Sequence, residues 1–168
     1  MVWARTKLSI WDYIFEPVKE ITMSFVTKDP EKFYKKVNSL MRSSFNVPEG
    51  YVQEKDFEWQ KLEDGNVFSV RWEVNKILDK FSYLSLEITL KGKSKGGKGK
   101  VSVRLAPKLV TEYPQDTLWQ QSIFYEMLRR FWHTFFYHKK RMEYIDLGKE
   151  LVIKLEQELK KFAEELNR

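Results

Sequence analysis

The sequence has 168 residues, 42% of them hydrophobic and 32% charged, which excludes a disordered chain and fits one domain with a real core. It has no cysteine and two histidines, which excludes disulfides, thiolate metal ligands, a cysteine nucleophile and a histidine-rich metal site. The net charge of +6 favours contact with polyanions without requiring it.

The first patterned segment, residues 8–16, is compatible with a short helix or with an extended lead-in that ends at Pro17. Residues 20–27 then alternate between apolar and polar side chains, and this period of two predicts a strand. Asp29 followed by Pro30 suits the N-cap and the first turn of a helix. Apolar residues at helical spacing extend that predicted helix to about residue 44.

Four strands of an antiparallel meander are predicted next, over residues 51–62, 67–78, 81–90 and 101–113. The dipeptide Asp64-Gly65 is a strong signal for the first hairpin turn. If these two residues form the turn, the aromatic pairs fall on one face of the sheet and an ion pair falls on the other. The predicted cross-strand partners are Phe57 with Trp72, Trp59 with Val70 and Glu58 with Arg71.

The apolar side chains of the third predicted strand share a sheet face with those of the second only if Ile88 lies opposite Trp72. That register requires a three-residue turn or a bulge near residues 78–81. In the fourth strand Pro107 has no N–H to donate, which predicts an edge strand or a bulge there.

From Asp116 onward the pattern is helical to the end of the sequence, and Asp146 and Gly148 are predicted to weaken the helix or to break it. The fold class is therefore α+β, with an antiparallel meander in β-α-β4-α order, a long C-terminal helix packed on one face and an additional C-terminal helix. We expect a single domain over residues 1–168, divided into a lead-in (1–19), a sheet-plus-helix core (20–141) and a C-terminal helix (142–168).

Over residues 20–140 this order of elements is similar to that of the helix-grip superfamily, which includes START lipid-transfer domains and polyketide cyclases. The resemblance implies a cavity between sheet and helix that holds a hydrophobic small molecule or lipid. An ordinary packed core requires the same apolar stripes and is the alternative interpretation. The implied cavity walls are Phe57, Trp59, Val70, Trp72 and Ile88 from the sheet and Phe124, Tyr125, Leu128, Phe131, Trp132 and Phe135 from the helix.

Residues 91–100, KGKSKGGKGK, form the most unusual segment, with five lysines and four glycines. Lysine neutralises phosphates without reading sequence, so a nucleic-acid-binding module is an alternative function. A mobile, solvated hairpin tip explains the same lysines. The residues assigned to this alternative are Lys91, Lys93, Lys95, Lys98, Lys100, Arg129, Arg130, Lys139, Lys140 and Arg141.

No convincing catalytic set emerges from the sequence. His133 and His138 are five residues apart and lie on different helical faces, which excludes a shared metal site. We therefore expect a non-enzymatic binding domain with no cofactor and no metal. The apolar stripe of the C-terminal helix leaves a homodimer, or an assembly subunit, as a third interpretation.

The apolar runs are shorter than the roughly 20 residues that a membrane span needs. Together with the lack of a signal-peptide core, this predicts a cytoplasmic protein. Many lysines and glutamates without cysteine are typical of heat-adapted proteins, which predicts an unfolding midpoint above roughly 65 °C.

Overall fold

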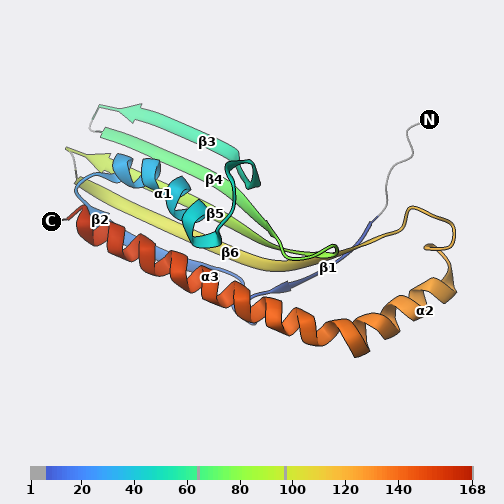
Figure 1. The fold of residues 1–168 in the computed structure, drawn as a ribbon. Helices are drawn as coiled ribbons and strands as arrows, with labels where there is room; N and C mark the ends of the chain where they lie inside the picture. Colours follow the sequence, from blue (N-terminus) through green and yellow to red (C-terminus); the bar gives the residue numbers. More distant parts are fainter. Residues whose placement is uncertain (1–6, 64, 97, 168) are drawn as a thin grey trace, which may run out of the picture.

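The computed structural model describes residues 7–63, 65–96 and 98–167, which form an α+β fold with helices on one face of a six-stranded antiparallel sheet (Figure 1). The predicted fold class is confirmed, with one further strand at the start of the chain. The strands are β1 (Lys7–Tyr13), β2 (Ile21–Thr27), β3 (Val52–Leu62), β4 (Gly65–Ile77), β5 (Ser82–Lys95) and β6 (Lys98–Pro114). The helical segments are α1 (Pro30–Phe45), the 3₁₀ turn η1 (Glu49–Tyr51), α2 (Ile123–Trp132), the π turn η2 (His133–Tyr137) and α3 (His138–Glu165).

Strand β6 pairs with β5 along one side and with two shorter strands along the other. Strand β2 pairs with residues 99–105 of β6, and β1, which lies in the predicted lead-in, pairs with residues 108–114. Pro107 lies where one partner ends and the other begins, and its carbonyl accepts from Ile14 N at 3.2 Å. Because N–H and C=O of one strand residue point to the same side, the missing N–H of Pro107 faces this junction. The strand therefore passes through Pro107 without being an edge of the sheet.

The sequence signals around α1 are confirmed. Asp29 is the N-cap, and its carboxylate accepts from the backbone N–H of Lys32 at 3.0 Å. Pro30 occupies the first turn, where its missing N–H costs nothing. The helix ends at Asn46, whose φ of 49° is the left-handed conformation typical of a C-cap.

The predicted register of the first hairpin is wrong by two residues. Leu62 pairs with Gly65, which moves the turn toward the N-terminus, and Asp64 of the predicted turn lies outside the described residues. A shift of two preserves the face of every side chain, so the alternation of apolar and polar residues did not distinguish the two registers. The observed partners are Phe57 with Val70, Trp59 with Phe68 and Asp56 with Arg71, and the last two form an ion pair.

The predicted register of the second hairpin is confirmed, since Trp72 lies opposite Ile88. Leu78 N donates to Ser82 O at 3.0 Å, which closes a three-residue turn over residues 79–81. Within it, the Asp79 carboxylate accepts from the backbone N–H groups of Phe81 and Ser82, each at 2.8 Å.

The lysine-rich segment, for which a mobile hairpin tip was one interpretation, is a hairpin that is largely paired. β5 extends to Lys95 and β6 begins at Lys98, so Lys93 lies opposite Lys100. Gly92 lies against the ring of Phe68, and a Cβ at this position would be 2.1 Å from Phe68 Cζ. That glycine therefore provides a close approach to the core rather than flexibility.

The hydrophobic core lies between the inner face of the sheet and helices α1 and α3. Phe33 and Met41 of α1 and Val152 and Leu155 of α3 are fully buried in it. The predicted weakness at Asp146 and Gly148 does not break α3, which continues through both residues. Gly148 instead allows α3 to approach the sheet closely, because a Cβ there would be 2.9 Å from Ile14 Cδ1.

Helices α2 and α3 follow one another through the π turn η2, and α2 extends beyond the end of the sheet (Figure 1). Arg129 is the buried residue of α2, whereas α3 buries an apolar stripe from Val152 to Ala163. The sheet thus packs against the C-terminal half of the continuous helical segment, and α2 projects beyond the sheet.

Candidate functional site

Large apolar side chains project outward from the segment before α2 and from α2 and η2. Leu118 is 89% exposed and Ile123 is 83% exposed. Contiguous exposed apolar surface of this kind typically marks an interaction site. We call this surface the outer apolar face, and its members are Leu118, Trp119, Ile123, Phe124, Met127, Leu128, Phe131, Trp132, Phe135 and Phe136.

Most of this face consists of adjacent pairs that repeat every four residues, ending with Phe131-Trp132 and Phe135-Phe136. Four residues exceed one α-turn of 3.6 residues, so such a repeat drifts around an α-helix. The π turn holds more residues per turn and offsets that drift. The rings consequently stay in contact across η2, with centroid separations of 4.6 Å for Phe131–Phe135 and 5.4 Å for Trp132–Phe136.

The opposite face of the same segment is polar and points toward the sheet. Arg129, which is 8% exposed, places its guanidinium 5.2 Å from the ring centroid of Tyr113. One turn later, His133 Nδ1 lies 2.9 Å from the Tyr113 hydroxyl. Burial lowers the pKa of His133, and Arg141 and Arg129 lower it further. A neutral imidazole therefore packs here at neutral pH.

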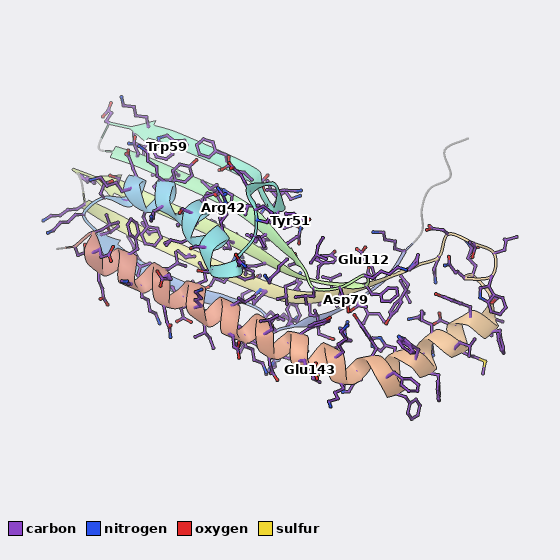
Figure 2. The ribbon with its side chains drawn as sticks, in the orientation of Figure 1. Arg42, Tyr51, Trp59, Asp79, Glu112 and Glu143 are labelled. Atoms are coloured by element: carbon purple, nitrogen blue, oxygen red, sulfur yellow. The ribbon has the colours of Figure 1, made fainter. Side chains whose placement is uncertain are left out.

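Tyr137 continues this inward series and binds the turn between β4 and β5. Its hydroxyl donates to the Asp79 carboxylate and lies 2.8 Å from Ser82 Oγ. Tyr144 also donates to Asp79, at 2.9 Å, and Lys140 Nζ lies 3.1 Å from the same carboxylate. Figure 2 shows Asp79 between the end of the sheet and the helix.

The Asp79 carboxylate is held in its ionised form by these partners. Burial opposes ionisation, but the backbone N–H groups of Phe81 and Ser82, with Tyr144 and Lys140, lower the pKa of Asp79 to about 2. An ionised acceptor makes these hydrogen bonds stronger than bonds between neutral groups. Asp79 is therefore a firm attachment point for the helix.

Arg141 is the fourth inward residue and is 1% exposed. Its guanidinium donates to Asp12 of β1 and to Thr111 of β6. Arg129, His133, Tyr137 and Arg141 follow one another at four-residue spacing, so one polar face of the helix binds the end of the sheet. This polar attachment directs the outer apolar face away from the domain.

The structure does not bring together the two walls implied by the helix-grip resemblance. Val70, Trp72 and Ile88 are buried beneath α1 and α3. Phe57 and Trp59 lie on β3, half exposed, and contact Tyr34 of α1 instead. Figure 2 shows Trp59 on the side of the sheet far from α2. Between the described sheet and α3, the gap beside Ile14, Leu84 and Gly148 has no room for a water molecule.

The helix residues assigned to that cavity lie on the projecting α2. Tyr125 is half-buried, and the exposed residues Phe124, Leu128, Phe131, Trp132 and Phe135 belong to the outer apolar face. Sequence reasoning did not assign Ile123, Met127 and Phe136 to a site. One sequence signal could have indicated this outward orientation. The polar residues from Arg129 to Arg141 recur on one helical face, and that face packs against the sheet.

The residues assigned to nucleic-acid binding form two separate groups. Lys91, Lys93, Lys95, Lys98 and Lys100 lie at the tip of the β5–β6 hairpin, whereas the helical arginines and lysines lie at the other end of the sheet (Figure 1). Lys91 lies nine residues along β5 from Ser82, at the helical end of the strand, which is roughly 30 Å at the usual rise per strand residue. Arg129 and Arg141 are buried against the sheet, while Arg130, Lys139 and Lys140 are exposed.

Basic side chains border the outer apolar face. Of the lysines and arginines in residues 123–141, Arg129 and Arg141 are buried against the sheet and Lys140 binds Asp79, so Arg130 and Lys139 are the ones beside this face. Arg130 lies 3.0 Å from Glu126 on one border of the stripe. Lys139 follows Phe131 and Phe135 at four-residue spacing and so extends their row. The surface therefore combines exposed aromatic rings with the exposed basic side chains of Arg130 and Lys139.

Among the described residues, no helix is long and apolar enough to cross a membrane, and no cluster of histidine, aspartate and glutamate could hold a metal ion. No protein-family model matches the chain, and a comparison with curated proteins gives no match.

Proposed function

We propose that this chain is a non-enzymatic binding domain that attaches to an anionic lipid surface through the outer apolar face. The observation that carries the proposal is the inverted orientation of α2 and η2, whose polar side binds the sheet while Phe131, Trp132 and Phe135 face outward. A helix that lies in a membrane interface has this composition, with tryptophan, phenylalanine and leucine on one side and basic residues beside them.

The charge around the face favours a lipid surface as its occupant. Each lysine or arginine near an anionic membrane contributes about 1 kcal/mol to attachment. Arg130 and Lys139 are exposed and close in sequence to the aromatic residues, whereas Lys140 binds Asp79. Each phenylalanine that leaves water adds roughly 1.5–3 kcal/mol. Rings and cations together supply both contributions that interfacial attachment needs.

Vesicle sedimentation tests this proposal with the full chain. Vesicles of phosphatidylglycerol and phosphatidylcholine should sediment the protein, and high salt or pure phosphatidylcholine should weaken the attachment. Phe131→Ser combined with Phe135→Ser should lower the affinity on the order of a hundredfold, because roughly 3 kcal/mol of ring burial is lost. Val26→Ser, at a β2 side chain that is 72% exposed, is the matched control and should change nothing.

Two results would overturn the lipid-surface proposal. The first is a failure to sediment with either vesicle, and the second is an affinity that the double serine variant leaves unchanged. Concentration-dependent dimerisation that the same variant abolishes would assign the outer apolar face to a second copy of the chain instead. Both serine positions are exposed, so the unfolding midpoint of the variant should match that of the wild type.

A second candidate function, polyanion binding, is favoured by the β5–β6 hairpin. Lys93 lies opposite Lys100, and Lys95 lies opposite Lys98. Like charges directly across a strand pair destabilise it, and a bound polyanion would relieve that repulsion. Single-stranded RNA at low salt is the appropriate probe, because electrostatic affinity is greatest there. Undetectable binding under those conditions would eliminate this candidate.

A further inference from the structure

The face of the sheet away from the helices carries all the lysines of residues 91–100. Leu90 and Val101, which flank this segment, are buried in the core beneath the helices, so the lysine next to each of them points to the other face. Because side chains alternate along a strand, every second residue of β5 and β6 shares that orientation. We call the resulting surface the lysine face, and its members, all exposed, are Lys91, Lys93, Lys95, Lys98 and Lys100.

Most of these lysines have no carboxylate partner. Among the residues that the structure describes, no ion pair involves Lys91, Lys93, Lys98 or Lys100. These four outnumber the two described carboxylates at the same end of β3, Glu58 and Glu63. The arginines nearby on this side of the sheet are already bound, Arg71 to Asp56 and Arg104 to Glu20. The lysine face therefore carries positive charge that the described part of the chain leaves uncompensated.

Small hydroxyl side chains lie beside the lysines. Lys91 is directly opposite Ser69 of β4 on one side and Ser102 of β6 on the other. Ser102 is in turn opposite Ser24 of β2, so a row of hydroxyls crosses the sheet next to the ammonium groups. Lysine and serine are among the side chains that contact phosphate oxygens in nucleic-acid complexes. The row therefore offers phosphate donors on a flat surface.

The same surface has no means of stacking bases. Among the described outward residues of β2, β3 and β4 and of the hairpin from Thr89 to Arg104, none is aromatic. Phe57 and Trp59 lie on the inner face, against Tyr34 of α1. Proteins that bind single strands use such rings as stacking platforms. A duplex keeps its bases stacked inside and presents a denser row of phosphates, with one charge per about 1.7 Å. The lysine face thus suits a duplex better than a single strand.

We propose that the lysine face binds double-stranded nucleic acid through the phosphate backbone, without reading its sequence. The inference rests on the second candidate function, polyanion binding, and names the ligand and the surface for it. It is independent of the lipid-surface proposal, because the outer apolar face uses other residues at the other end of the sheet (Figure 1).

Fluorescence anisotropy with labelled DNA of mixed sequence tests the proposal on the full chain. At low salt a duplex of two helical turns should bind at least about fivefold more tightly than either of its strands alone. A second duplex of unrelated sequence should bind equally well. The slope of log K against log salt concentration should lie between about −3.6 and −4.5, which corresponds to four or five neutralised phosphates.

A pair of charge-matched variants locates the surface. Lys93→Gln with Lys100→Gln should weaken duplex binding at least about tenfold and reduce the magnitude of the salt slope by about 1.8. These two lysines repel each other across the strands, so their replacement does not weaken the hairpin, and lost affinity reports a lost contact. Lys35→Gln with Lys36→Gln is the control, since it removes the same charge from exposed positions of α1 and should bind like the wild type.

The other outcomes separate this inference from the two functions proposed above. Equal losses in both variant pairs would show a response to net charge alone and would overturn the assignment. Tighter binding of single strands would overturn the duplex as ligand and keep the polyanion candidate, whereas no binding of either would remove both. Vesicle attachment that the Lys93 and Lys100 variant loses, without duplex binding, would assign the lysine face to a lipid surface instead. Phe131→Ser with Phe135→Ser should keep full duplex affinity, so failure of the lipid-surface proposal leaves this inference standing.

Discussion

The hydroxyl of Tyr137 lies 3.0 Å from the Asp79 carboxylate, and this bond joins the π turn to the turn between β4 and β5. Together with Arg141, which binds Asp12 and Thr111, it fixes the rotation of the helix about its own axis. That rotation decides which side chains of α2 face outward. The exposure of the outer apolar face therefore depends on a few polar contacts at the end of the sheet.

The first prediction concerns the pH dependence of stability. The pKa of Asp79 is lowered from 3.8 to about 2 in the folded protein. Because the folded pKa is depressed, this contribution is fully present above about pH 4 and is lost as the pH falls toward 2. The shift corresponds to on the order of 2 kcal/mol. Urea unfolding of Asp79→Asn should show a loss of that size at pH 7, and the difference from wild type should narrow below pH 4. A pH-independent difference would contradict this account.

The Tyr137–Asp79 bond should also appear as coupling between the two residues. Tyr137→Phe keeps the ring and removes the hydroxyl that Asp79 and Ser82 share. We expect a loss of about 1.5–3 kcal/mol in the free energy of unfolding, because a hydrogen bond to an ionised carboxylate is removed. Combined with Asp79→Asn, the losses should be non-additive by at least about 0.5 kcal/mol. Full additivity in this cycle would show that the two residues act separately.

A third prediction tests the close approach of Gly92 to Phe68. A Cβ at this position would be 2.1 Å from Phe68 Cζ, so the ring has to move. Gly92→Ala should lower the free energy of unfolding by about 1–3 kcal/mol through overpacking. Gly50→Ala is the control, because a Cβ there has no neighbour within 4 Å. Equal effects of the two substitutions on thermal and urea unfolding would show that the ring is free to adapt.

The lysine pair at the hairpin tip gives a fourth prediction. Lys93→Glu would convert the repulsive pair with Lys100 into an attractive one, and we expect a gain of about 0.2–1 kcal/mol in stability. Lys93→Gln, which only removes repulsion, should give a smaller gain, and 1 M salt should reduce both. A hairpin that binds RNA should lose affinity in the glutamate variant. A loss of stability in Lys93→Glu would show that the lysine has another structural role.

Local chemistry predicted much of this fold. The Asp29-Pro30 pair marked the start of α1, and alternation with a suitable turn placed Trp72 opposite Ile88. The first hairpin was harder, because a two-residue shift leaves every side chain on the same face. The bulge in the pairing between Glu54 and Asp56 has no distinct signal in the residues themselves.

The candidate site was the least predictable part, for a physical reason. An apolar helical stripe is expected to face the core, and that expectation placed Phe124, Leu128 and Phe131 against the sheet. The opposite face carries Arg129 and Tyr137, which find partners in Tyr113, Asp79 and Ser82. Those partners come from turns and strands distant in sequence. Only the three-dimensional structure therefore shows that the polar face is the one that packs against the sheet.

The π turn has a consequence for how this chain tolerates change. Successive residues of an α-helix are separated by about 100° around the helix axis. Deleting one residue from His133–Tyr137 would convert the turn to regular helix and rotate α2 by about that angle relative to α3. The aromatic rings would then face the sheet, and Arg129 would face solvent. The spacing between Trp132 and His138, more than the identity of the five residues within it, sets the direction in which this helix presents its surface.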